Sequence, residues 1–140
     1  MKTTVLLATL LLLIFTFISC SSQSNKKVVA QKVESSNVNV YYFHFTRRCA
    51  TCLAVEDNAR KAVEALFPNE VKAGDYSFTA INLDEASSKE IANKLSVGGQ
   101  TLLVVRGDKK IDITDKGFLN AHDLEKMKVE IKSAVDKVLF

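Results

Sequence analysis

The chain has 140 residues, of which 47% are hydrophobic and 25% charged, and its formal net charge is +3. These values are ordinary for a globular protein and leave room for one domain beside a targeting segment. The net charge is too small, and the lysines too dispersed, to indicate a nucleic-acid partner. The three cysteines, Cys20, Cys49 and Cys52, are too few for a disulfide-stapled scaffold. Each of them is therefore a candidate for a reactive or modified thiol.

Residues 1–19 have the pattern of an export signal. Lys2 precedes an apolar run from Val5 to Ile18, and a polar stretch starts at Ser21. A run of about 14 apolar residues is shorter than the ~20 that a membrane-spanning helix needs. The pattern therefore predicts a secretory signal.

Cys20 follows that signal directly. Phe17-Ile18-Ser19-Cys20 resembles the lipobox of bacterial lipoproteins, although Phe17 stands where leucine is usual. The resemblance implies that Cys20 is acylated, becomes the N-terminus and anchors the chain on the periplasmic face of a bacterial membrane. An uncleaved signal anchor with an incidental cysteine is the alternative. Residues 20–37 lack a sustained apolar period and predict a flexible tether, with the folded domain at residues 38–140.

The first half of that domain predicts a strand, a helix and a second strand. Val38–Phe45 is a β-branched and aromatic run, which is typical of a strand buried on both faces. Apolar residues then recur at helical spacing from Cys49 to Leu66, and Pro68 is expected to end this helix. Tyr76–Leu83 predicts the second strand.

The second half predicts a helix, a hairpin and a last helix. Ser87 or Ser88 can cap a short helix that runs through Leu95. The hairpin joins strands at Thr101–Val105 and Lys110–Thr114, and Asn120 caps a helix whose apolar stripe runs from Leu124 to Val138. The order β-α-β-α-β-β-α predicts a three-layer α/β fold with a mixed central sheet and flanking helices.

Cys49-Ala50-Thr51-Cys52 stands where the first strand meets the first helix. The helix N-terminus stabilises a thiolate at Cys49, and lowering the thiol pKa from about 8.5 to about 7 would ionise about half of it at neutral pH. Arg47 and Arg48 add positive charge. Cys52, one turn further on, is placed to attack a mixed disulfide. We therefore expect an exposed nucleophile at Cys49 and a less exposed resolving thiol at Cys52.

Two other interpretations of this pair stay open. Paired thiolates suit a soft metal or metalloid such as copper(I) or arsenite, and His44 could add a third ligand beside Cys49 and Cys52. The heavy-metal-associated domain also carries such a pair, but its order β-α-β-β-α-β ends on a strand. The chain could also be a non-catalytic subunit of a redox complex. A purely structural disulfide is disfavoured because its loop is too short to stabilise much.

Residues 38–140 resemble the thioredoxin-like superfamily. The order of elements carries this resemblance, together with the cysteine motif, Ile81–Asp84 and Thr101–Val104. Tyr42–Phe45 combined with Arg48–Cys52 is also similar to the ArsF-type family of small exported proteins, which is named for a nitroreductase subunit. The resemblance implies a membrane-tethered thiol–disulfide oxidoreductase. Its partner would be a thiol or disulfide protein, and its redox-active disulfide would need no other cofactor.

The chain departs from this superfamily around the cysteines. Phe43 stands where the family has a buried acid and Ala80 where it has a lysine, so Cys52 lacks its usual proton acceptor. His44 could substitute, although alternation places it on the opposite strand face from Phe43.

Gln100 replaces the family's cis-proline. A non-proline cis bond costs ~3–4 kcal/mol, so we expect a trans bond or a displaced loop. Arg48, Gln100 and Thr101 are the expected supporting residues.

Overall fold

The computed structural model describes residues 37–140, so the predicted signal peptide, the lipidation at Cys20 and most of the tether lie outside it. The elements in chain order are β1 (Val38–His44), α2 (Ala50–Leu66), α3 (Pro68–Ala73), β2 (Tyr76–Asn82), the 3₁₀ turn η1 (Ala86–Ser88), α4 (Lys89–Leu95), β3 (Thr101–Arg106), β4 (Lys109–Asp112), α5 (Thr114–Leu119) and α6 (Leu124–Leu139). Every predicted strand and helix is present. The short elements α3, η1 and α5 are additional to the prediction.

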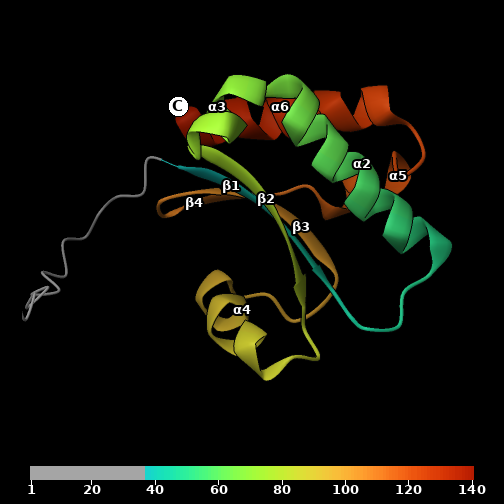
Figure 1. Cartoon of the computed structure of the whole chain (residues 1–140). Helices are drawn as coiled ribbons and strands as arrows, with labels where there is room; N and C mark the ends of the chain where they lie inside the picture. The colour runs from blue at the N-terminus through green and yellow to red at the C-terminus, as the bar shows by residue number, and fades with distance from the viewer. Residues whose placement is uncertain (1–36) are drawn as a thin grey trace, which may run out of the picture. The chain divides into compact units, whose positions relative to one another are not determined.

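The strands of the described region form one mixed sheet in the order β2-β1-β3-β4 (Figure 1). β1 runs parallel to β2, with His44 beside Asn82, and antiparallel to β3, with Tyr41 opposite Leu103. β3 and β4 form the predicted antiparallel hairpin. β1 is therefore a central strand, as its apolar sequence predicts.

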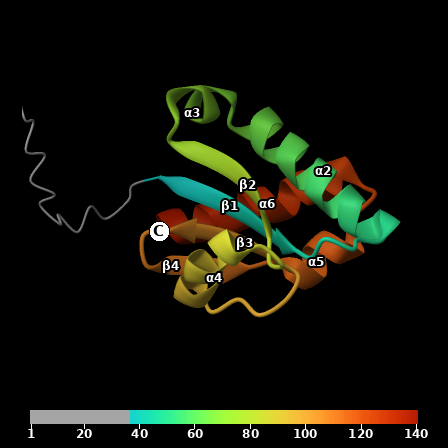
Figure 2. The same ribbon diagram turned by 60° about the horizontal axis from the view of Figure 1, so that its bottom comes forward.

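Helices cover both faces of the sheet, as the two views together show (Figure 1, Figure 2). On one face Val40 and Tyr42 of β1 pack with apolar side chains of α2 and α6. On the other face Phe43 and Leu103 pack with Ala92 of α4. Neighbouring β1 residues point to opposite faces because side chains alternate along a strand. The α/β class and the mixed sheet with flanking helices are therefore confirmed.

Helix α2 ends just before Pro68, as predicted, and Pro68 also begins a further helix. It occupies the first turn of α3. A proline is tolerated there because the first turn of a helix has no partner for that N–H group. Gly74 ends α3 with a φ of 82°, a backbone conformation that glycine adopts without steric cost.

Of the two predicted helix caps, Asn120 is wrong and Ser88 is correct in position only. Asn120 ends α5, whereas α6 is capped by Asp123, whose carboxylate accepts a hydrogen bond of 3.0 Å from the Lys126 N–H group. Ser88 is the N-cap residue of α4, but its hydroxyl donates to the Glu85 carbonyl at 2.7 Å and makes no capping hydrogen bond. In both loops several neighbouring residues are of capping type, so composition does not select the one that caps. No helix within residues 37–140 is long and apolar enough to cross a membrane.

Substitution of Leu102 tests the packing of α2 and α6 against the sheet. It lies in β3, is fully buried and packs in the cluster formed with α2 and α6. Leu102→Ala leaves a cavity, and we expect it to lower the free energy of unfolding by about 3 kcal/mol. The matched control is Leu119→Ala, because Leu119 is 83% exposed, and its effect should stay within about 0.5 kcal/mol. Urea unfolding measures both, and equal losses would contradict this packing.

Candidate active site at the Cys49–Cys52 pair

Cys49 and Cys52 form a disulfide at the start of α2, with their Cα atoms 5.2 Å apart. Cys49 is the N-cap residue of the helix, and its Sγ accepts a hydrogen bond of 3.3 Å from the Cys52 N–H group. Cys49 is exposed, whereas Cys52 is only 4% exposed. The difference in exposure that the sequence predicts is therefore present.

The first turn of α2 favours negative charge on Cys49. This turn contains no acidic residue, so nothing within it offsets the partial positive charge of the unpaired N–H groups. The Cys52 N–H group already points at the Cys49 sulfur. After reduction the same group can donate to a Cys49 thiolate, and such charge-assisted bonds are stronger than neutral ones.

Arg48 directly precedes Cys49 in the chain, and its guanidinium has a counter-charge. It forms an ion pair with Glu56 of α2, whose other carboxylate oxygen lies 2.8 Å from Arg60. The side chains of Arg48 and Glu56 are 23% and 16% exposed, so water screens them only partly. Glu56 therefore offsets part of the positive charge that Arg48 would lend to Cys49. Sequence reasoning missed Glu56, although its i,i+4 spacing to Arg60 predicts half of this network.

The loop before Cys49 is tied to the end of β2. The Thr46 N–H group donates to the Asp84 carboxylate at 2.8 Å, and the Asn82 amide donates to the Thr46 hydroxyl at 3.0 Å. The hydrogen bonds from Thr46 lower the pKa of Asp84 below its ordinary value. The lowered pKa stabilises the fold above about pH 4, and this contribution is lost as pH falls through that pKa.

Gln100 reaches the buried sulfur. Its amide Nε2 lies 3.4 Å and its Oε1 3.8 Å from Cys52 Sγ. No peptide bond within residues 37–140 is cis, so the Gln100 bond is trans as predicted. Thr101, the other supporting residue of this loop, donates its hydroxyl hydrogen to the Gly99 carbonyl at 2.9 Å. The loop thus brings an amide to Cys52, at the position where thioredoxin-like proteins have a proline.

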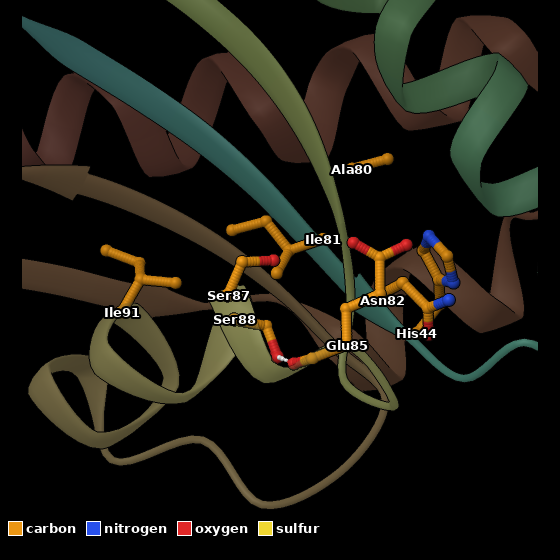
Figure 3. A pocket seen from close by; sticks show the side chains of 8 residues that line it. All are labelled: His44, Ala80, Ile81, Asn82, Glu85, Ser87, Ser88 and Ile91. Carbon is orange, nitrogen blue, oxygen red and sulfur yellow. Dashed lines mark hydrogen bonds between the residues drawn. The ribbon is translucent and has the colours of Figure 1, made fainter.

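His44 is held at the end of β1. It is 8% exposed, and its Nδ1 lies 3.0 Å from the Phe45 carbonyl, which can only accept, so Nδ1 carries the hydrogen. His44 is one of the residues that line a hollow of about 420 Å³. Among these residues, the Glu85 carboxylate points toward the His44 ring (Figure 3). Phe43 lies wholly buried in the cluster on the α4 face. The position where thioredoxin-like proteins have a buried acid is therefore part of the apolar core here.

Cys49, Cys52 and His44 are not assembled as a three-ligand metal site. Across residues 37–140, no group of three or more His, Cys, Asp or Glu side chains is placed to hold a metal ion. Both sulfurs are also engaged in the disulfide. A metal would have to use the two thiolates of the reduced pair with ligands from elsewhere.

The Tyr42 hydroxyl is a second group that sequence reasoning missed. The side chain is fully buried on the α2 face of β1, and its hydroxyl makes no hydrogen bond to any described residue. Burial raises the pKa of Tyr42, while the nearby charge of Arg48 lowers it and that of Glu56 raises it. The phenol is therefore neutral at physiological pH, within electrostatic range of the Arg48–Glu56 ion pair.

Comparison with known proteins adds little to this description. No protein-family model matches the chain, and no curated protein matches it. Among solved structures, one described as "Structure of a malarial protein" is similar over 70% of this chain and 97% of its own, with 20% sequence identity and a TM-score of 0.46. A similarity of this size carries no conclusion about fold or function.

Removing the Glu56 charge should make the cysteine pair more oxidising. In Glu56→Gln the Arg48 guanidinium loses its counter-charge and can stabilise a Cys49 thiolate, which favours the reduced form. We expect the pKa of the Cys49 thiol to fall by about one unit and the reduction potential to rise by about 30 mV. The pH dependence of alkylation and equilibration with glutathione measure the two quantities.

Glu64→Gln is the matched control, because it removes the same charge from an exposed position further along α2. It should leave both quantities unchanged. An equal shift in both variants, or an unchanged potential in Glu56→Gln, would show that Arg48 does not act on Cys49.

Proposed function

We propose that this chain is a thioredoxin-like thiol–disulfide oxidoreductase, anchored by lipid at Cys20 to the periplasmic face of a bacterial membrane. The observation that carries the proposal is a disulfide between an exposed Cys49 at a helix N-terminus and a buried Cys52. The mixed sheet with helices on both faces and the order of elements support membership of the superfamily. The location rests on the lipobox-like pattern at Phe17–Cys20.

The reaction is disulfide exchange with a thiol or disulfide protein. In the reducing direction, the Cys49 thiolate attacks one sulfur of a partner disulfide. A Cys49–partner bond forms, the partner's S–S bond breaks, and its other sulfur leaves as a thiolate. Cys52 then releases its proton to solvent and attacks Cys49 Sγ. The Cys49–Cys52 bond forms, and the partner's second sulfur leaves as a thiolate, so two electrons have passed to the partner.

The oxidising direction is the reverse of these two steps. Which direction prevails depends on how strongly the Cys49 thiolate is stabilised, since potentials in this fold span ~150 mV. Exposure of Cys49 gives a partner sulfur access to the bond in either direction. The small loop closed by the disulfide stabilises the fold little, which also favours a functional over a structural bond.

Substitution of each cysteine separates their roles. We expect Cys49→Ser to abolish exchange, because no other exposed thiolate is available in the domain. We expect Cys52→Ser to accumulate a mixed disulfide between Cys49 and a partner, because the resolving thiol is gone. Non-reducing electrophoresis with and without reductant reveals the trapped species.

Two outcomes would replace the proposal. If Cys52→Ser traps nothing and both variants lose a stoichiometric soft metal after anaerobic purification, the pair is a binding site for that metal. If the double Cys→Ser protein keeps its full cellular role, the domain acts as a subunit without exchange.

The mature protein should begin at a lipidated Cys20. Mass spectrometry of protein extracted from membranes should show loss of residues 1–19 and an added acyl mass on Cys20. Cys20→Ser should prevent both changes. An intact Met1, or an unmodified Cys20 in the wild-type protein, would contradict the anchor while leaving the exchange reaction untouched.

A further inference from the structure

We propose that Gln100 is a catalytic residue of this exchange, because its side-chain amide can form a hydrogen bond with the Cys52 sulfur in both redox states. The inference rests on the proposed function and extends it to the step in which Cys52 takes part. Both polar atoms of the Gln100 amide face Cys52 Sγ, with Nε2 at 3.4 Å and Oε1 at 3.8 Å.

An amide suits a sulfur that changes its hydrogen-bonding character. In a disulfide or a thiolate the sulfur has only lone pairs, and it can accept from the Gln100 N–H group. In the thiol form it carries a hydrogen, which it can donate to the Gln100 carbonyl oxygen. A rotation about the last side-chain bond exchanges the two atoms. A carboxylate at this position could only accept.

The surroundings of Cys52 make such a partner necessary. Cys52 is 4% exposed, so water stabilises a thiolate there poorly, and an unpaired buried charge is costly. The family's acid and lysine positions are occupied by Phe43 and Ala80, which offer no polar side-chain group. The Nδ1 of His44 is committed to the Phe45 carbonyl. Within residues 37–140, the Gln100 amide is the side-chain group that forms a hydrogen bond with Cys52 Sγ.

The loop that carries Gln100 is ordered by local bonds. Ser96 ends α4 with a φ of 58°, and the Val97 N–H group donates to the Ala92 carbonyl at 2.8 Å. The Thr101 hydroxyl closes the other end on the Gly99 carbonyl. The amide is therefore presented from a defined backbone next to β3.

The contact assigns Gln100 to one of the two chemical steps. When Cys52 attacks Cys49 Sγ, negative charge leaves Cys52 as the new S–S bond forms. In the reverse step, an incoming thiolate bonds to Cys49 Sγ, the Cys49–Cys52 bond breaks, and its electron pair stays on Cys52 Sγ. The Gln100 N–H group stabilises that charge, whereas its hydrogen bond in the described region is to Cys52 Sγ and not to Cys49. Its loss should therefore slow the Cys52 step alone.

The experiment uses the reduced full-length protein and 5,5′-dithiobis(2-nitrobenzoate). Attack by Cys49 releases one coloured thiolate, and attack by Cys52 on the mixed disulfide releases the second, so stopped-flow absorbance separates the two steps. Gln100→Met keeps the chain length but removes the amide, and Gln100→Glu keeps the shape but leaves an acceptor only. Asn93→Ala, at an exposed position of α4, is the control.

We expect the first phase of both Gln100 variants to stay within about twofold of the wild type. The second phase of Gln100→Met should be about tenfold slower at pH 7, as expected for loss of a hydrogen bond to a charged group. Its pH midpoint should rise by about one unit. Gln100→Glu should be slower still, because its carboxylate repels the thiolate, and the control should match the wild type.

Three results would overturn the inference. An unchanged second phase in both Gln100 variants would show that the amide is not used. Equal slowing of both phases would show that Gln100 only maintains the fold. If the wild-type protein releases no second thiolate, the proposed function itself fails and the inference falls with it.

Discussion

The junction between β1 and α2 is held by hydrogen bonds to the end of β2, and the rest of the site depends on it. The Leu83 N–H group donates to the His44 carbonyl at 2.7 Å, and Asp84 accepts from the Thr46 N–H group at 2.8 Å. These bonds fix the loop that leads to Cys49, while β1 is paired along both edges. α2 can therefore begin at a defined point, with the Cys52 N–H group directed at the exposed Cys49 sulfur.

The two sulfurs differ because their neighbours differ. Cys49 lies at the helix terminus in contact with solvent, and the preceding residue, Arg48, has its charge paired with Glu56. Cys52 is buried under the first turn and contacts the Gln100 amide. A helix terminus stabilises a thiolate on the outer sulfur, whereas an amide can accommodate both a thiol and a thiolate on the inner one. This asymmetry suits a two-step exchange with one attacking and one resolving thiol.

Sequence reasoning located the strands and long helices because their apolar patterns are regular, and the burial of β1 follows from its unbroken apolar run. It missed the short helix that begins at Pro68, because a helix of this length has no apolar period. It also failed at Asn120, where several polar residues compete as caps. The cysteine pair is readable because its spacing is local. The contact between Gln100 and Cys52 joins residues 48 positions apart, so it depends on tertiary packing. Sequence reasoning placed Gln100 near the pair without revealing what its side chain does.

The reduction potential of the Cys49–Cys52 couple tests the central claim most directly. Anaerobically purified protein would be equilibrated with glutathione buffers, and its metal content recorded on the same sample. We expect a reversible two-electron couple between about −270 and −120 mV, the range of exchange-active thioredoxin-like proteins, without a stoichiometric metal. A potential below about −300 mV, which is typical of structural disulfides, or a soft metal retained on the reduced pair would contradict it.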